Sequence, residues 1–475
     1  MKKNDKLELN IIDMTKEGLG LAKLDGQVFF VKDAIIGDKV LAIVTKITNS
    51  IVYAKTIDVI EKSMYRVEPR CNIANACGGC QLLCLDYSEQ LKLKVNNVNN
   101  CLTKIGHFNI VLDDNVISDD SINLNNSEKN DNVHYLGILH SENPYNFRNK
   151  IQIPFSMRDG KIVYGFYAGR THHIVEFNKC EVGFIGIEKV LDRVKGGLEK
   201  YGISIYDENT NRGIFREVML RMGNFANEVS ITYIVNDLDF KKNLDLYKKL
   251  DEYVRNDFKV IVTSTLNINT ANNNVLFGNE NIIIYGKGYI EDRIGEIKYH
   301  ISPESFYQIN MEMTKKLYDT VVEFAGFNGN ENVLDLYCGI GTISLYIAKH
   351  VKRVYGVEIV ERAVENAREN ASLNNICNVE FKCADLGNKN IMNNDEFYDT
   401  IIVDPPRKGL DKNTIDFIKG SNTDKIIYVS CDPATLSRDL SIICNDNKYK
   451  LVKIKNVDMF PHTMHVETVA LVIRV

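Results

Sequence analysis

A cysteine and a glutamate near the end of the sequence are the residues best placed for covalent chemistry. Cys431 follows the apolar run Lys425–Val429, which predicts a buried strand, and it precedes Pro433, a residue favoured in the first turn of a helix. The dipole of that helix is expected to lower the thiol pKa and so favour a thiolate nucleophile. Glu467 interrupts a last apolar run and alone resembles an exposed strand end. Paired with Cys431, it becomes a candidate general base.

A glycine-bearing turn and four acids indicate a second site, which suits a cofactor. The predicted strand Val333–Leu336 runs into a turn with Gly339 and Gly341, where a ligand can approach the backbone. The third glycine of the dinucleotide fingerprint is missing, which argues against NAD. An acid about 20 residues further on can accept the two ribose hydroxyls. Because ligands of open parallel sheets lie at the carboxyl ends of the strands, four acids are expected at that edge: Asp335, Glu358, Asp385 and Asp404.

The run Asp-Leu-Tyr-Cys-Gly-Ile-Gly-Thr at residues 335–342 resembles motif I of the class I S-adenosylmethionine-dependent methyltransferases. With a thiolate and a base, such a methyl donor permits methylation of a pyrimidine at C5. C5 of uracil is too weak a nucleophile to attack a sulfonium methyl group unaided. A thiolate that adds at C6 turns the ring into an enolate-like carbanion, and a base then removes the C5 proton so that the cysteine is eliminated. The sequence offers all three groups.

Four further cysteines have a spacing that indicates a metal or cluster site. Cys71, Cys77 and Cys80 are close together, with two glycines between the last two, and Cys180 follows in a distant segment. A disulfide framework is not expected, because the cytosol keeps thiols reduced. Zinc sites more often pair two C-x2-C units, whereas three close cysteines and a distant one favour an iron–sulfur cluster. Cys84 is a rival ligand that the spacing does not exclude.

The composition is that of an ordinary globular protein. Of 475 residues, 44% are hydrophobic and 25% are charged, and the length predicts about three domains. No apolar run approaches the ~18 residues that cross a bilayer, and the N-terminus has no apolar signal segment, so we expect a cytoplasmic protein with no membrane partner. The net charge of −5 argues mildly against indiscriminate binding to nucleic acid, but it leaves room for a local basic surface.

The order of predicted elements divides the chain into three units. Residues 1–62 contain five short strands with glycine turns, which is typical of an OB-type barrel. Residues 63–300 hold the cysteines, a helix over Ser88–Ile105 and an α+β pattern. Within them, 113–132 is rich in Asn, Asp and Ser and is predicted to be a flexible insertion. In residues 301–475 strands and helices alternate, which predicts a doubly wound, Rossmann-like parallel α/β sheet.

This combination of features resembles the RNA uracil-5-methyltransferase family, specifically its 23S ribosomal RNA branch, over nearly the whole chain. The resemblance implies that residues 1–62 form a TRAM domain, which is an RNA-binding barrel. It also implies that Cys71, Cys77, Cys80 and Cys180 bind a [4Fe-4S] cluster. RNA is then the expected partner, and a monomer is the expected state. Neither the uridine modified, nor the number of sites served, nor the cluster's role follows from the sequence.

The same resemblance assigns residues around the cofactor and the target base. Ser305–Asn310 matches a family segment beside the cofactor, which implies that Gln308 contacts S-adenosylmethionine and that Phe306 lies against the target base. The Ser-Cys-Asp-Pro run around Cys431 matches the nucleophile motif, and His-Val-Glu-Thr around Glu467 matches the base motif. The remaining cofactor positions are Tyr337, Glu358, Asp404, Asp385 near the adenine, Asp335 and Gly339.

Other functions compete with uracil methylation of ribosomal RNA. Asp404-Pro-Pro resembles the motif of amino-methyltransferases, but an aromatic residue usually follows it there. Here Arg407 follows, which suits a phosphate or a base edge of the substrate. Cytosine-5 methylation shares the thiolate chemistry but has a different sequence around the cysteine. Transfer RNA is an alternative substrate. A non-catalytic RNA-binding ribosome assembly factor would need only the barrel and the cluster, and it would not need Cys431 or Glu467.

Overall fold

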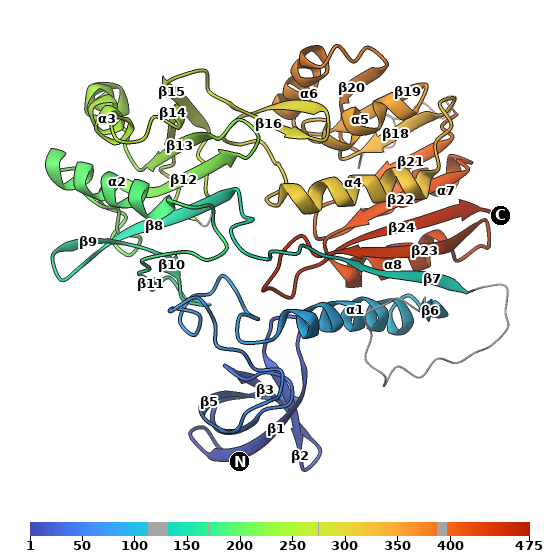
Figure 1. Cartoon of the computed structure of the whole chain (residues 1–475), viewed down its shortest axis with the longest axis horizontal. Helices are drawn as coiled ribbons and strands as arrows, with labels where there is room; N and C mark the ends of the chain where they lie inside the picture. Colours follow the sequence, from blue (N-terminus) through green and yellow to red (C-terminus); the bar gives the residue numbers. More distant parts are fainter. Residues whose placement is uncertain (113–131, 170, 274, 387–396) are drawn as a thin grey trace.

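The computed structural model describes residues 1–112, 132–169, 171–273, 275–386 and 397–475, and Figure 1 shows how they are arranged. A small barrel lies at the N-terminal end, a central sheet carries two helices, and a large sheet fills the C-terminal part. The insertion predicted over 113–132 lies outside the described residues, apart from Asn132. None of the described helices is long and apolar enough to cross a membrane.

The N-terminal strands close into a five-stranded barrel in the order β1-β2-β3-β5-β4, as the sequence predicted. Buried and more exposed side chains alternate along β4, so one face of the strand lines the barrel core. Asp38 connects the barrel to residues 63–84, which we call the cysteine segment. Its buried carboxylate accepts from the Ser63 N–H at 3.0 Å and from Arg66. The strands are β1 (Lys6–Met14), β2 (Gly20–Leu24), β3 (Gln27–Lys32), β4 (Lys39–Ile47) and β5 (Ile51–Glu61).

The central part is a six-stranded sheet, in the order β15-β14-β13-β12-β8-β9, with helices α2 and α3 packed against it around one apolar core. Two short hairpins, β10–β11 and β16–β17, complete it. The bounds are β8 (Lys150–Arg158), β9 (Lys161–Tyr164), β10 (Phe166–Tyr167), β11 (Ile174–Val175), α2 (Ile187–Tyr201), β12 (Phe215–Gly223), β13 (Glu228–Val235), α3 (Phe240–Arg255), β14 (Ile261–Ile268), β15 (Glu280–Tyr285), β16 (Ile290–Ile294) and β17 (Ile297–Ile301).

The C-terminal sheet has nine strands, in the order β20-β19-β18-β21-β22-β24-β23-β7-β6, and two separate apolar cores cover its faces. The neighbouring strands β20, β19, β18, β21 and β22 are all parallel, which confirms the predicted Rossmann-like arrangement. Strand β24 is antiparallel to both β22 and β23. The elements are α4 (Met311–Ala325), β18 (Asn332–Leu336), α5 (Thr342–Ile347), β19 (Arg353–Glu358), α6 (Glu361–Leu373), β20 (Val379–Cys383), β21 (Thr400–Val403), α7 (Lys412–Gly420), β22 (Lys425–Ser430), α8 (Pro433–Ile443), β23 (Tyr449–Val457) and β24 (Glu467–Arg474).

Part of the segment that the sequence placed in the central unit lies on this C-terminal sheet instead. Strands β6 (Ile110–Leu112) and β7 (Val133–Leu139) form its edge, and helix α1 (Tyr87–Lys104) packs beside α8. The reason is burial, because Val98 of α1 and Tyr135 of β7 complete the apolar core on one face of the sheet. Figure 1 shows β7 next to β23 at the lower side of the sheet, with α1 below it.

Candidate functional site

Three parallel strands bring the predicted cofactor residues to one edge of the sheet. Leu336 of β18 is paired with Val357 of β19 on one side and with Val403 of β21 on the other. The next residue of each chain segment is Tyr337, Glu358 and Asp404, respectively. These three residues therefore lie side by side at the carboxyl ends of the strands, where open α/β sheets bind their ligands.

The turn after β18 has a shape that already leaves room for a ligand. Tyr337 has a φ of 66°, a left-handed value that strains a residue with a side chain. Its N–H donates to the Val357 carbonyl at 2.9 Å, which holds the strained residue in place. Gly339 has a φ of 56°, and a Cβ placed there would meet no atom within 4 Å, so the backbone faces open space. The Gly339 N–H donates to the Glu358 carboxylate at 3.1 Å, which joins the turn to the neighbouring acid.

The acids at this edge concentrate negative charge where little solvent reaches. Asp335 is completely buried, and burial together with the charge of Glu358 raises its pKa to about 7 against the opposing hydrogen bond from Ser344. Burial and the charge of Asp335 likewise raise the pKa of Asp404 to about 7. One carboxylate oxygen of Asp335 has no hydrogen-bond partner among the described residues. A buried acidic site of this kind favours a positively charged ligand.

Cys431 and Glu467 lie at neighbouring ends of two adjacent strands. Strand β22 pairs with β24 in an antiparallel register that ends with Ser430 opposite Thr468. Cys431 directly follows Ser430, Glu467 directly precedes Thr468, and the charge of Glu467 acts on the Cys431 thiol. Asp432 caps α8 directly after the cysteine, because its side chain accepts from the Ala434 N–H at 3.0 Å. Residues from two chain regions are thus placed at the same edge as Asp404.

The pKa of the Cys431 thiol differs from the sequence prediction. The expected effect of the helix dipole was a lower pKa, but burial and the charges of Glu467 and Asp404 raise the pKa of Cys431 to about 12, against the opposing charge of Arg407. The prediction of a lowered pKa is therefore wrong for this protein as described. Burial and the charge of Asp404 also raise the pKa of Glu467 to about 8, again opposed by Arg407.

The other predicted site residues differ in how buried they are and in whether their charges act on Cys431, Glu467 or Tyr337. Arg407 is exposed, yet its charge acts on both Cys431 and Glu467, so it lies beside them. Asp385 is exposed, and its charge acts on Tyr337. The side chain of Gln308 is buried just before α4. Phe306 is 72% exposed and lies on the surface, so the structure does not bury it in the site.

Two buried residues that the sequence analysis missed hold the segment that carries Gln308. Arg221 of β12 donates to the carbonyls of Ser302 and Ser305 at 3.2 and 2.8 Å, and Asn149 donates to the Gln308 carbonyl at 3.0 Å. A signal for Arg221 was present, since it is a lone cation within the buried run of β12. Its partners could not be read from the sequence, because they are backbone carbonyls about 80 residues away.

The four predicted cysteine ligands gather between the cysteine segment and the central part. Burial and the charges of Cys180, Cys77 and Cys71, in that order, raise the pKa of Cys80 to about 12, so the four sulfurs are neighbours. The charges that act on Cys84 are those of Arg66, Glu68 and Asp33. Within the described part of the chain, no three or more His, Cys, Asp or Glu side chains are arranged to hold a single metal ion.

The fold and this site define a class of protein, the S-adenosylmethionine-dependent methyltransferases. A solved structure, the tRNA (uracil-54, C5)-methyltransferase of Pyrococcus abyssi in complex with S-adenosyl-L-homocysteine, superposes with a TM-score of 0.74. It is 24% identical, and the match covers 98% of this chain and 100% of that chain. This likeness establishes the fold.

Sequence comparison establishes the family. The profile of the family described as "tRNA (Uracil-5-)-methyltransferase" matches residues 225–475. An uncharacterized RNA methyltransferase of Bacillus cereus is 37% identical, and one of Clostridium acetobutylicum is 38% identical; each match covers 100% of this chain and 98% of the relative. The chain belongs to this family, and it is an S-adenosyl-L-methionine-dependent RNA uracil-5-methyltransferase.

Proposed function

We propose that this protein methylates C5 of a uridine in 23S ribosomal RNA, with Cys431 as the nucleophile and Glu467 as the base. The observation that carries the two roles is the register of β22 and β24, which brings Cys431 and Glu467 to neighbouring strand ends beside Asp404. A nucleophile and a base must reach neighbouring atoms of one ring, and residues on adjacent strands meet this requirement.

The reaction assigns one bond change to each residue. The Cys431 sulfur forms a bond to C6 of uracil, and the electron pair of the C5–C6 double bond becomes available at C5. S-adenosyl-L-methionine would supply the methyl group from its positively charged sulfur, so that the bond from C5 to the methyl carbon forms as the sulfur–methyl bond breaks and S-adenosyl-L-homocysteine is left. Glu467 then removes the C5 proton, the double bond re-forms, and the C6–sulfur bond breaks to release Cys431 as a thiolate. The pKa of Glu467, raised to about 8, suits a base that works near neutral pH.

The residues at the edge of the sheet fit the cofactor. S-adenosyl-L-methionine is a cation, and among the described residues no positive side chain opposes the raised pKa values of Asp335 and Asp404. The open space at Gly339 allows close approach of the ligand to the backbone. We assign the cofactor contacts to these three residues together with Tyr337, Glu358, Asp385 and Gln308.

A cleft of about 520 Å³ between the barrel and the cysteine segment supports RNA binding by residues 1–62. Phe30 and Tyr53 line it with their rings 5.8 Å apart and edge to face, and the cations of Lys16 and Lys32 lie along it. Aromatic rings stack on unpaired bases, and lysines attract the phosphates. His465, two residues before Glu467, lies at the same cleft, so RNA bound there is continuous with the reaction centre. On this basis we assign residues 1–62 to a TRAM-like barrel and 301–475 to the methyltransferase unit, whose sheet α1, β6 and β7 extend, and the rest of 63–300 to a central unit.

Cys71, Cys77, Cys80 and Cys180 are proposed to hold a [4Fe-4S] cluster. The donor set fits, because four cysteines line one small cavity and four thiolates are the usual ligands of such a cluster. In such a cluster each thiolate binds a different iron, so the sulfurs need not converge on one point as they would around zinc. A cluster bound there would cross-link the segment that carries Cys71, Cys77 and Cys80 to the segment that carries Cys180.

Anaerobically purified protein is expected to be brown and to contain about four iron and four sulfide ions per chain. The double change Cys77→Ser and Cys80→Ser should abolish the visible absorbance, because it removes two of the four ligands. Cys84→Ser is the matched control, and the colour should persist because this thiol lies beside Arg66 instead. A colourless protein that holds stoichiometric zinc would overturn the assignment.

Transfer RNA is the second candidate substrate. It is favoured by the matching family, the tRNA (uracil-5-)-methyltransferases, and by the Pyrococcus abyssi enzyme, whose structure has the same fold. Ribosomal RNA is favoured by resemblance, because the barrel and the four clustered cysteines match the 23S ribosomal RNA branch of the family. The two candidates share the chemistry at Cys431 and differ only in the RNA.

The proposal is tested with labelled S-adenosyl-L-methionine and two substrates, unmodified 23S ribosomal RNA and unmodified transfer RNA. We expect 5-methyluridine in the ribosomal RNA alone, with no label in a Cys431→Ala control. Label in transfer RNA alone would keep the mechanism and reject the ribosomal assignment. Absence of label in both, from protein with an intact cluster, would contradict the proposed function.

A further inference from the structure

The loop Asp458–His465 connects β23 to β24 and ends two residues before Glu467. It contains neither strand nor helix, yet Asp458, Met459, His462 and Met464 are buried. Buried polar groups outside regular structure need partners from elsewhere in the chain. At its base the loop is closed by the pair of Val457 with Glu467, so the loop is attached directly to the residue that carries the carboxyl group.

Lys94 of α1 is the first partner of the loop. It is completely buried, it forms an ion pair with Asp458, and it donates to the Phe460 carbonyl at 3.0 Å. The hydroxyl of Tyr87 donates to the other oxygen of Asp458 at 2.6 Å. Buried ion pairs add little net stability, because desolvation offsets their attraction, whereas removing one partner is costly. The main consequence of this contact is therefore a fixed position for the start of the loop.

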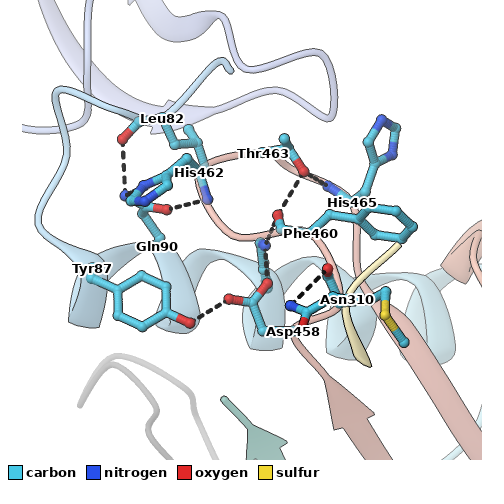
Figure 2. Close-up of polar contacts among 11 residues, drawn as sticks. Leu82, Tyr87, Gln90, Asn310, Asp458, Phe460, His462, Thr463 and His465 are labelled. Atoms are coloured by element: carbon cyan, nitrogen blue, oxygen red, sulfur yellow. Dashed lines mark hydrogen bonds and ion pairs between the residues drawn. The ribbon is translucent and has the colours of Figure 1, made fainter. Parts of the chain in front are cut away.

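Gln90, one turn earlier on α1, is the second partner. Its side-chain oxygen accepts from the His462 N–H at 3.0 Å, and its nitrogen donates to the carbonyls of Leu82 and Leu85 at 3.0 and 2.8 Å. The Leu82 N–H in turn donates to the His462 carbonyl at 3.0 Å. Figure 2 shows Gln90 between Leu82 and His462, and Asp458 beside Tyr87. His462 has a left-handed φ of 63°, which these bonds hold in place.

The loop thereby connects separate functional segments. Leu82 lies between Cys80 and Cys84, so the end of the loop is bonded directly to the cysteine segment. The Asn310 side chain donates to the Met459 carbonyl at 3.4 Å, which joins the loop to the segment that carries Gln308. The position of the loop is thus set by α1 and these two segments together.

We propose that Gln90 and Lys94 are positioning residues for Glu467, because they fix the loop that delivers its carboxyl group to the reaction centre. The inference rests on the proposed role of Glu467 as the base. Neither residue touches Cys431 or the cofactor edge in any contact measured among the described residues, so they act on proton removal and not on thiol addition.

The test compares Gln90→Leu with Asn100→Leu, the same type of change at an exposed position of α1. Each protein is mixed with S-adenosyl-L-methionine and the RNA transcript that the wild type methylates. For Gln90→Leu we expect turnover to fall about 10²-fold, since misplacing a reacting group by about 1 Å costs that much. Covalent protein–RNA adduct should accumulate on denaturing gels, cofactor affinity should stay unchanged, and amide exchange should quicken in 458–467. Asn100→Leu should behave as the wild type.

Each other outcome has a defined meaning. Normal turnover by Gln90→Leu would overturn the positioning role. So would a Gln90→Leu protein that forms no adduct and no longer binds the cofactor. If Gln90→Leu does not fold, the double variant Lys94→Met with Asp458→Asn replaces it, since it removes both buried charges at once; absence of adduct there also overturns the proposal. Glu467→Gln is measured in parallel. Normal turnover by Glu467→Gln would reject Glu467 as the general base. If Glu467→Gln forms the adduct and Gln90→Leu does not, only the positioning role of Gln90 is rejected.

Discussion

Glu467→Gln is expected to stop the reaction after the methyl group has been transferred, so that a covalent protein–RNA adduct accumulates. Glutamine has nearly the same shape as glutamate but cannot take the C5 proton, and without that step Cys431 is not released. General base catalysis contributes about 10²–10⁴-fold, so turnover should fall by that factor. One equivalent of S-adenosyl-L-homocysteine per protein should still form, because methyl transfer precedes the blocked step. Denaturing gels and a single-turnover assay measure both quantities.

The pH dependence of the wild type provides a second measurement of the same residue. Burial and the charge of Asp404 raise the pKa of Glu467 to about 8. A base is active when it is ionised, so the rate of adduct decay should increase about tenfold per pH unit below pH 8 and level off above it. Glu467→Gln should lose this dependence.

Two results would contradict the role of Glu467. The first is full turnover by Glu467→Gln with no trapped adduct. The second is an adduct that decays at the wild-type rate in Glu467→Gln, which would mean that another group removes the C5 proton. The single variant Cys431→Ala serves as the control and is expected to form no adduct while it still binds S-adenosyl-L-methionine.

The parts of the site that follow from local sequence patterns were predictable. Val333–Leu336, the glycine turn and the acid at residue 358 follow one another as strand, turn, helix and strand, and the structure has them in that order. The spacing of three parallel strands then brings Tyr337, Glu358 and Asp404 to one edge. Such an arrangement is visible in a sequence because each element has its own periodicity.

The parts that depend on distant contacts were not predictable. Nothing in the sequence near residue 133 shows that β7 pairs with β23, more than 300 residues further on. Gln90 and Lys94 do show a signal, since two polar residues four positions apart interrupt the buried stripe of α1. Their partners could not be inferred, because Asp458 and His462 belong to a loop at the other end of the chain. A periodicity reveals which face is buried, but it does not reveal what covers that face.

The pKa of the Cys431 thiol could not be predicted from the sequence for the same reason. The helix after Asp432 is a local feature, and from it a lowered pKa was predicted. Burial and the charges of Glu467 and Asp404 are non-local, and together they raise the pKa to about 12. The thiol of the free protein is therefore protonated near neutral pH. The charge of Arg407 does not offset this effect, so the nucleophile needs a further positive charge before it can react.

The cofactor itself is expected to supply that charge, so S-adenosyl-L-methionine should accelerate alkylation of Cys431 by iodoacetamide. Methyl transfer brings the reacting atoms within about 3–3.5 Å of each other, so the sulfonium must approach the uracil ring that Cys431 attacks. A charge of opposite sign that close lowers a thiol pKa by about 1–3 units, which is a gain of about 10- to 1,000-fold in thiolate. Mass spectrometry of the peptide that contains Cys431 measures the rate separately from the other ten cysteines.

S-adenosyl-L-homocysteine is the matched control, because its sulfur is neutral and its shape is otherwise similar. It should leave the alkylation rate of Cys431 unchanged or slow it by shielding. Arg407 gives a control within the chain, since its charge lowers the thiol pKa. Arg407→Met should slow alkylation, and Arg407→Lys should restore it because the charge is kept. Equal rates with the two cofactor forms would show that the sulfonium does not activate the thiol, and the neighbouring carboxyl groups would then have to be neutralised by the RNA substrate instead.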